Sequence, residues 1–367
     1  MTLKGLFLCL VFLLCNATSH AADDLITRQV TIKLDKAGTL PDKIGSSRKY
    51  KITNLKIVGE INGTDWRLIR DMAGRDFDRT ETSGELSVLD LSEAKIVSGG
   101  SRYDAHTFRS TPNNCIGENA FVFCSGLTSI TLPSGVTSIG GAAFEDCRGL
   151  TSLTIPPGVT EIGASTFRHC SGLTSLSLPS SLTSIGESAF EGCSGLTSLT
   201  LPSGVTSIGE SAFEGCSGLT SLTIPSGVTS INESAFEDCS GLTSLAIPSS
   251  VTLIDDYAFA YCSGLTSIYV YPEKVPILRK DTFSGCDAKN CTVYVPTGTY
   301  DDYWLSDFGY FENIVEFDAT GIDKVTTSND AKELSRYSVN GQRLSAPTKG
   351  LNIVKYSDGS VKKVAVQ

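Results

Sequence analysis

Histidine is scarce in this 367-residue chain, which has three in all and only His106 and His169 beyond its first 22 residues. The chain also has no C-x-x-C, H-E-x-x-H or G-x-S-x-G motif, and its glycines recur in repeated turns rather than in a phosphate-binding loop. Zinc sites, metalloproteases, serine hydrolases and nucleotide-binding proteins depend on those residues and spacings. We therefore expect no catalytic residue, no metal and no cofactor, and we predict that the protein is not an enzyme.

Basic residues are almost missing from the middle of the chain. Between residues 118 and 272, only Arg148 and Arg168 oppose 13 Asp and Glu residues, and the whole chain has a net charge of −10. An acidic surface of this kind repels phosphate backbones and anionic lipid headgroups. The composition therefore argues against nucleic acid as a partner.

Long apolar runs are missing after the first 15 residues. Lys4 precedes an apolar stretch at residues 5–15, and residues 19–21 form a small-x-small cleavage pattern, so we predict a secretory signal peptide over residues 1–22. Two leucines precede Cys15, where lipoprotein processing would favour small residues. A stretch this short does not span a bilayer as a helix. We expect a mature protein without a transmembrane helix, either secreted or held at the cell surface.

Phenylalanine and cysteine, by contrast, recur together at a fixed spacing. Seven cysteines follow one another at intervals of 23 residues, and a phenylalanine stands three positions before each. The pairs are Phe121–Cys124, Phe144–Cys147, Phe167–Cys170, Phe190–Cys193, Phe213–Cys216, Phe236–Cys239 and Phe259–Cys262. Self-similarity with a period of about 20 to 29 residues is the signature of a leucine-rich-repeat solenoid.

One unit, residues 194–216, shows how a coil would close. Three leucines at residues 196–201 point inward, and Pro202 ends their strand because proline cannot donate to a ladder. A second inward pair follows at residues 205–208, and we expect a short helical turn at residues 209–213. A single coil has no closed interior, so stacked neighbours must supply one. The predicted fold is a solenoid of short parallel β-strands and short helical turns, with the Phe–Cys pairs in its core.

An irregular N-terminal region precedes the repeats. Residues 30–34 and 55–59 have the composition of strands, and residues 66–72 predict a helix that Thr64 or Asp65 would cap. A solenoid needs its first coil sealed from water, and an atypical first unit does that. We therefore predict an N-terminal cap over residues 23–115.

The regular repeats are expected over residues 116–286, and they decay towards the C-terminus. A final strand at residues 291–296 and an aromatic-rich stretch predict a lid over the last coil, within residues 287–318. A polar linker is expected at residues 319–334. Residues 335–367 predict a small β module, because Asn340-Gly341 and Asp358-Gly359 are strong hairpin turns.

The repeated unit L-x-x-L-x-L-P-x-x-V-x-x-I-x-x-x-A-F-x-x-C, which recurs from Leu127 to Cys262, resembles the BspA-type leucine-rich-repeat family. With the irregular leader and the lid, the resemblance covers residues 30–317. The tail at residues 337–366 resembles C-terminal β modules of exported Bacteroidetes proteins, some of which direct sorting or attachment. The family resemblance implies a secreted or surface-displayed, non-enzymatic protein associated with adhesion to host proteins or other cells.

The evenly spaced cysteines could form disulfides in an exported protein. Stacked coils would place their Cα atoms about 5 Å apart, inside the disulfide range, but parallel Cβ vectors do not suit the required dihedral angle. Cysteine also packs well as a small buried hydrophobe. We expect the repeat cysteines to be buried free thiols, and we leave a disulfide open only for Cys286 and Cys291, at the irregular end.

Glutamates also form rows across the repeats. One row contains Glu187, Glu210 and Glu233, and a second contains Glu145, Glu191, Glu214 and Glu237. Adjacent carboxylates could share Ca²⁺ or bind a basic partner. Alternatively, glutamate near the start of each short helical turn favours the helix dipole and keeps the surface soluble. We favour the second interpretation.

The first strand of each coil predicts the binding surface. Its outward residues are small and hydroxylated, and we name as candidates Ser152, Thr154, Ser175, Ser177, Ser198, Thr200, Ser221, Thr223 and Tyr269. Repeat proteins commonly bind with such an extended face, although Ser and Thr are also ordinary solvent-facing strand residues. Tyr269, with Tyr257, Tyr261 and Tyr271 near it in sequence, would form a local hot spot, or these tyrosines would pack under the lid.

We therefore predict a monomeric solenoid that recognises an extracellular or host protein, with adhesion as its role. A passive spacer that displays the C-terminal module is the alternative. A glycan-binding or glycan-active protein is less favoured, because no acid/base pair lies in a predicted cleft.

Overall fold

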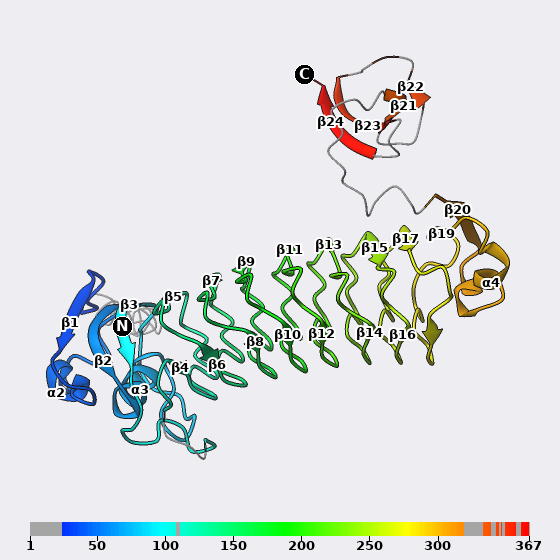
Figure 1. Cartoon of the computed structure of the whole chain (residues 1–367). Helices are drawn as coiled ribbons and strands as arrows, with labels where there is room; N and C mark the ends of the chain where they lie inside the picture. The colour runs from blue at the N-terminus through cyan, green and yellow to red at the C-terminus, as the bar shows by residue number, and fades with distance from the viewer. Residues whose placement is uncertain are drawn as a thin grey trace, which may run out of the picture.

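A computed structural model describes residues 24–107 and 111–318, and residues 333–338, 343–344, 346, 349–356 and 361–366 of the C-terminal part. The chain forms an elongated solenoid whose coils follow one another in sequence order (Figure 1). The signal peptide predicted at residues 1–22 lies outside the described residues, as does most of the predicted linker. In the described part of the chain, no helix has the length and apolar character needed to cross a membrane.

The N-terminal end is irregular. It contains β1 (Val30–Leu34), α2 (Leu40–Ile44), β2 (Asn54–Ile61), α3 (Gly63–Met72) and β3 (Val88–Ile96). The three strands pair in parallel and continue the strands of the first coils as one sheet.

Helix α3 seals this end of the core. It begins earlier than expected and is capped by Asn62, whose side chain accepts the Thr64 N–H at 3.0 Å, while Asp65 accepts the Asn62 N–H at 2.9 Å. The cap expected at Thr64 or Asp65 was therefore wrong, although Asp65 completes a reciprocal capping box. On the same helix, Arg70 is fully buried and forms an ion pair with the buried Asp104 at 3.0 Å.

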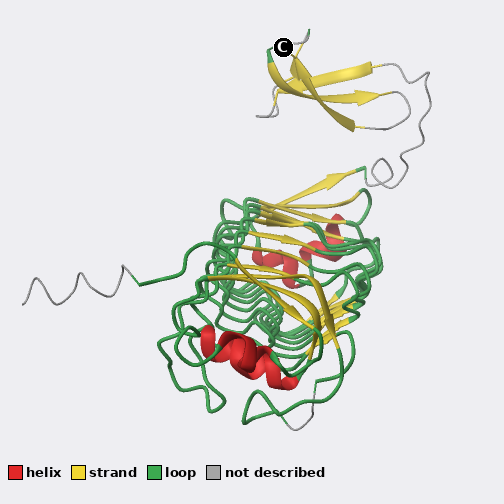
Figure 2. Ribbon diagram, turned by 90° about the vertical axis from the view of Figure 1, so that its left-hand side faces the viewer, coloured by secondary structure: helices red, strands yellow, loops and turns green. Residues whose placement is uncertain are grey.

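Most coils contribute two short strands. The first strands are β5 (Ser129–Thr131), β7 (Ser152–Thr154), β9 (Ser175–Ser177), β11 (Ser198–Leu199), β13 (Ser221–Leu222), β15 (Ser244–Ile247) and β17 (Ser267–Val270). The second strands are β4 (Cys115–Ile116), β6 (Ser138–Ile139), β8 (Glu161–Ile162), β10 (Ser184–Ile185), β12 (Ser207–Ile208), β14 (Ser230–Ile231), β16 (Leu253–Ile254) and β18 (Ile277–Leu278). Strands of adjacent coils pair in parallel, so they lie in rows along the solenoid (Figure 2).

The third side of each regular coil consists of tight turns rather than the short helical stretch that we expected. In one coil the Ala212 N–H bonds to the Gly209 carbonyl, and the Phe213 N–H crosses to the Ala235 carbonyl of the next coil at 2.9 Å. Ser211 and Gly215 both have positive φ, of 52° and 67°. A right-handed helix cannot continue through left-handed residues. Backbone N–H groups of each turn therefore form hydrogen bonds with carbonyls of the adjacent coil rather than within a helix.

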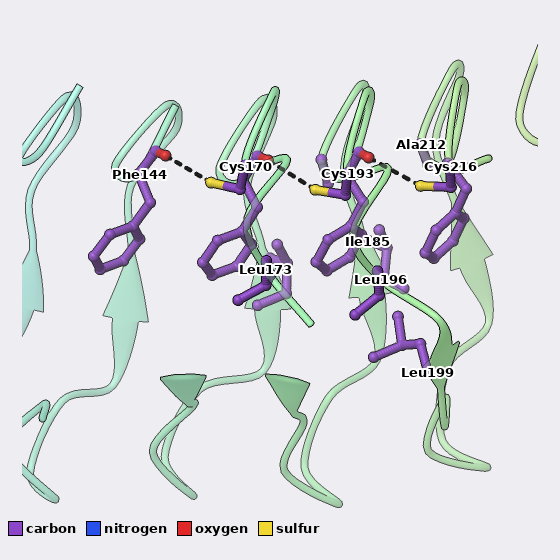
Figure 3. Packing of buried hydrophobic residues seen from close by; sticks show 14 of the residues in the cluster. Phe144, Cys170, Leu173, Ile185, Cys193, Leu196, Leu199, Ala212 and Cys216 are labelled. Atoms are coloured by element: carbon purple, nitrogen blue, oxygen red, sulfur yellow. Dashed lines mark hydrogen bonds between the residues drawn. The ribbon is translucent and has the colours of Figure 1, made fainter. Parts of the chain in front are cut away.

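The Phe–Cys pairs form the core, and all are buried. The phenylalanine rings from Phe121 to Phe283 stack in one column, with centroids 5.2 to 5.7 Å apart and planes within 11° of parallel. Figure 3 shows part of this column beside the cysteines. Trp66 of α3 meets Phe121 edge-on at 5.4 Å and ends the column at the N-terminal side.

The C-terminal end closes with β19 (Thr292–Pro296), α4 (Tyr300–Trp304), a 3₁₀ turn η1 (Asp307–Tyr310) and β20 (Asn313–Phe317). The strand expected to be the last one of the solenoid, β19, is followed by β20, which pairs with it in parallel. The buried Phe308 and Phe311 both lie 5.3 Å from Phe283 and cover the last ring of the column.

The C-terminal part forms a separate antiparallel sheet. Its strands are β21 (Glu333–Ser338), β22 (Arg343–Leu344), β23 (Gly350–Tyr356) and β24 (Val361–Val366), in the order β22-β21-β23-β24. The pairings β21–β22 and β23–β24 are those that the two predicted hairpins require. The hairpin dipeptides themselves lie outside the described residues, and the first strand begins two residues before the predicted module.

Candidate functional site

The candidate site is the outward face of the first-strand row, from β5 to β20, which we call the strand face. The alternation of each short strand turns leucine and isoleucine inward and the small hydroxyl residues outward. The eight predicted Ser and Thr residues from Ser152 to Thr223 are all exposed in the structure. The parallel registers Ser152↔Ser175 and Ser198↔Ser221 align them in rows.

A neighbouring row of threonines differs from these hydroxyls, because its members form hydrogen bonds between coils. Thr174 Oγ1 donates to the Thr151 carbonyl at 3.1 Å, and Thr220 Oγ1 donates to the Thr197 carbonyl at 3.2 Å, so this row ties coils together. Within the described residues, none of the eight hydroxyls of the strand face has a hydrogen-bond partner. They are therefore free to bind water or a ligand.

The strand face is hollowed in two places. A shallow hollow of about 400 Å³ lies over β5, β7 and β9, and a second of about 490 Å³ lies over β9 and β11. The row of strands divides between β9 and β11, which are not paired in the described chain. At this gap Leu176 and Leu178 are only partly buried, so the second hollow combines a hydroxyl rim with an apolar floor.

An aromatic cluster ends the strand face at its C-terminal side. Tyr269 stacks on Tyr294 with centroids 4.6 Å apart, and Phe317 meets Tyr269 and Tyr271 edge-on at 6.0 and 5.4 Å. All four rings are partly buried, and partial burial raises the pKa of Tyr269. The cluster lies where the outward row changes from hydroxyl residues to Ala246, Tyr269 and Tyr294.

The sequence identified only part of this cluster. Tyr269 and Tyr271 belong to it, whereas Tyr257 and Tyr261 lie in turns before and after Phe259, with positive φ of 56° and 58°. Tyr294 and Phe317 were not anticipated as members. Their signal is present in the sequence, because each lies an odd number of residues from an inward strand residue and so faces outward, but the aromatic content around residues 313–317 predicts a lid there rather than a strand.

The cysteines form no disulfide among the described residues. All ten described cysteines are free and buried, and these include Cys286 and Cys291, the pair whose position at the irregular end allowed a disulfide. From Cys147 onwards, each repeat thiol donates to the carbonyl of the phenylalanine one coil earlier, for example Cys193 to Phe167 at 3.0 Å. Burial raises the pKa of the Cys193 thiol to about 12, so the thiols are protonated and unreactive at neutral pH.

The glutamate rows lie on the turn side of the solenoid. Between α3 and α4 the described residues form no helix, so the helix dipole does not explain these glutamates. The Glu210 carboxylate raises the pKa of Glu233. Partial burial favours a higher pKa for Glu191 as well. Hydrogen bonds from Arg168 and Ser188 to its carboxylate outweigh that effect and hold the pKa of Glu191 below its ordinary value. In the part of the chain that the structure describes, no group of three or more His, Cys, Asp or Glu residues could hold a metal ion.

Solved structures of bacterial leucine-rich-repeat proteins resemble this chain. A leucine-rich repeat protein from Bacteroides ovatus is 29% identical with a TM-score of 0.44, and the match covers 59% of this chain and 57% of that protein. The leucine-rich repeat protein of T. pallidum is 34% identical with a TM-score of 0.40, over 42% of this chain and 72% of that one. A leucine rich cell surface protein from Faecalibacterium prausnitzii is 24% identical with a TM-score of 0.38, over 80% and 91%. This chain thus spans little more than half of the B. ovatus structure.

No curated protein sequence matches the chain. The family described as "BspA type Leucine rich repeat region" matches in six copies over residues 106–202 and 185–307, which together make up more than half of the chain. No enzyme family appears among these matches. The matched residues contain the Phe–Cys column and the part of the strand face from β5 to β19. The chain belongs to the BspA-type leucine-rich-repeat family.

Proposed function

We propose that this protein is an exported recognition solenoid that binds an extracellular or host protein through its strand face, and that its role is adhesion. One observation carries the proposal: an extended exposed face of unpartnered hydroxyls borders two hollows and ends in a partly exposed aromatic cluster. Extended faces of this kind are the usual binding surface of repeat proteins, and aromatic residues are favoured at the centre of interfaces.

The chemistry of the face indicates what kind of partner it takes. The face is almost uncharged, whereas the turn side carries the glutamate rows. A partner would therefore bind through apolar contacts and neutral hydrogen bonds, with little dependence on salt. The hollow over β9 and β11, with Leu176 and Leu178 in its floor, is the place for an apolar side chain of that partner.

A pair of matched substitutions tests the binding face. The mature chain is assayed by biolayer interferometry against a panel of extracellular-matrix proteins, and then as Ser177→Arg and Ser207→Arg variants. Ser177 lies on the strand face, and Ser207 is an exposed serine of the second-strand row. We expect Ser177→Arg to weaken binding by about tenfold or more, because it fills the hollow with a charged side chain, and Ser207→Arg to leave binding unchanged. If Ser207→Arg alone weakened binding, the strand face would not be the site.

The same experiment addresses the alternatives. A passive spacer would bind none of the panel, and a glycan-binding protein would give signal on a glycan array instead.

Export and attachment are tested by fractionating cells that express the chain with and without residues 335–367. We propose that the signal peptide exports the protein and that the C-terminal module retains it at the surface. Equal release of both forms into the medium would contradict that role of the module.

A further inference from the structure

Strongly exposed large apolar side chains are confined to the C-terminal end of the solenoid. In the described chain they are Tyr261, Ile277, Tyr300, Trp304, Leu305, Tyr310 and Val315. The described residues from 24 to 260 have none, so most of the solenoid keeps its large apolar side chains inside. A local concentration of exposed apolar surface marks an interaction site.

Three of these residues form what we call the cap patch: Tyr300, Trp304 and Leu305. The rings of Tyr300 and Trp304 stack at 6.1 Å, and Leu305 at the end of α4 is 85% exposed. The Glu316 carboxylate accepts the Gly298 and Tyr300 N–H groups at 2.8 and 3.1 Å. This contact holds the start of α4 against β20, and Figure 1 shows the two elements beside each other.

The cap patch also lies at a sheet edge. Strand β20 is the outermost strand of its six-stranded sheet, so in the described residues its outer backbone groups have no strand partner. Strand β24 is likewise the outer strand of the C-terminal sheet. Unpaired edges are places where another strand can add.

The charged residues near the cap patch indicate what kind of segment can bind there. Residues 300–318 contain six Asp and Glu residues and no Lys or Arg. Residues 333–367 have the opposite character, with six Lys and Arg residues against two acidic ones, in a chain whose net charge is −10. The basic segment therefore complements the acidic surroundings of the cap patch.

The connection between the two segments is short. The connection consists of residues 319–332, which follow Asp318 directly. Fully extended, these 14 residues span at most about 45 to 50 Å. A segment tethered this closely has a high effective concentration at the cap patch.

We propose that the cap patch is the docking surface for the chain's own basic C-terminal segment, residues 333–367, in the same molecule. Docking covers Trp304 and Leu305 and places the lysines of the segment beside Asp301 and Asp302. If the segment holds the protein at the cell surface, as proposed above, docking also fixes the direction in which the solenoid projects from that surface. This inference does not rest on the function proposed for the strand face.

The two tryptophans of the chain supply the test. Trp66 is fully buried and Trp304 is 46% exposed, so acrylamide quenching of the mature chain reports on Trp304, and a Trp304→Phe variant verifies that assignment. We expect the quenching constant to rise by about twofold in the Lys362→Glu/Lys363→Glu variant, because loss of docking returns the indole to water. The same rise is expected for Asp301→Asn/Asp302→Asn, and for the unmodified chain at about 0.5 M NaCl, where charges are screened within about 4 Å.

Lys33→Glu/Lys36→Glu is the charge-matched control at the other end of the molecule and should leave the quenching constant unchanged. The salt titration needs no substitution, so a variant that fails to fold does not leave the proposal untested. Quenching that is the same in the unmodified chain, in both variants and in salt would overturn the proposal. Shielding that grows with protein concentration, together with dimers in light scattering, would also overturn it, because the segment would then dock on a second copy.

Discussion

The thiol of Cys193 donates a hydrogen bond to the carbonyl oxygen of Phe167, one coil earlier, over an Sγ–O distance of 3.0 Å. The same carbonyl accepts the backbone N–H of Cys170 in its own coil at 3.0 Å. This pattern recurs from Cys147 to Cys286 with distances of 3.0 to 3.3 Å, and Figure 3 shows three of these bonds. The repeated cysteine therefore joins coils through hydrogen bonds of its thiol.

Removing one of these thiols should weaken the solenoid measurably. Cys193→Ala is expected to lower the free energy of unfolding by about 1 to 2 kcal/mol, because it deletes the hydrogen bond and leaves a small buried cavity. Cys193→Ser keeps a donor near the Phe167 carbonyl and should lose less. Guanidinium unfolding under reducing conditions measures both values. Equal losses for Ala and Ser would mean that the thiol contributes only packing.

The buried thiols also make stability depend on alkaline pH. Burial raises the pKa of Cys193 and Cys239 to about 12 and that of Cys124 to about 11, whereas an unfolded thiol titrates near about 8.5. Above the unfolded pKa the unfolded chain releases protons that the folded chain keeps. The contribution of these thiols to the free energy of unfolding should therefore be constant below about pH 8 and then fall by up to about 1.4 kcal/mol per pH unit for each such thiol.

Guanidinium unfolding at pH 7.5, 8.5 and 9.5, with a phosphine reductant, measures this slope. The Cys193→Ala variant should show a shallower fall than the unmodified chain, by the share of one thiol. A free energy of unfolding that did not change over this range would contradict the assignment of buried, protonated thiols.

One glycine of the repeat is required by the close approach of coils, and the chain contains its own control. A Cβ at Gly218 would lie 2.2 Å from the Ser194 carbonyl oxygen of the preceding coil, whereas a Cβ at Gly126, at the same repeat position in the first regular coil, has no atom within 4 Å. Gly218→Ala should lower the melting temperature and destabilise by about 1 to 3 kcal/mol. Gly126→Ala should be neutral or stabilising by up to about 1 kcal/mol. Similar effects of the two substitutions would show that the coil spacing adapts.

The sequence predicted the parts of the fold that the 23-residue period determines. Inward leucines, the phenylalanine column and the buried cysteines all follow from side chains that must face the same way in every coil. The outward position of Ser177 and Thr200 follows from the same alternation. Repetition makes each assignment a test of the others, which is why these expectations were confirmed.

The turn side could not be predicted in the same way, because backbone conformation rather than hydrophobic pattern decides it. The residue before each repeat cysteine is left-handed, and Asp146, His169, Gly192 and Asp238 all occupy this position. Glycine tolerates that conformation and aspartate and histidine are enriched in it. This shared feature accounts for His169, and it excludes a helical turn such as the one expected at residues 209–213.

The C-terminal end was the least predictable part, because its residues occur once and no repeat checks them. The aromatic-rich stretch was correctly expected to cover the last coil, but Asn313–Phe317 forms a further strand of the sheet. As a result, Phe317 joins Tyr269 and Tyr294 on the strand face rather than in the core. The relevant signal, the inward Ile314 between outward neighbours, is too short to distinguish a strand from a lid.

The ends of the phenylalanine column should control where the solenoid opens. Phe308 and Phe311 cover Phe283 at 5.3 Å, and Trp66 covers Phe121 at 5.4 Å. Phe308→Ala removes a fully buried ring, a change that costs about 3 to 5 kcal/mol in a packed core. Because each coil contacts only its neighbours, the loss should be felt first by the coils at that end.

We expect hydrogen exchange followed by mass spectrometry to show faster exchange of β17, β19 and β20 in Phe308→Ala, with unchanged protection of β5 and β7. Trp66→Leu is the matched variant at the opposite end and should give the reverse pattern, with loss of protection in β3 and β5. Uniform acceleration in both variants would contradict local opening. The solenoid would then unfold as one cooperative unit, and the capping rings would stabilise all coils equally rather than the ones they touch.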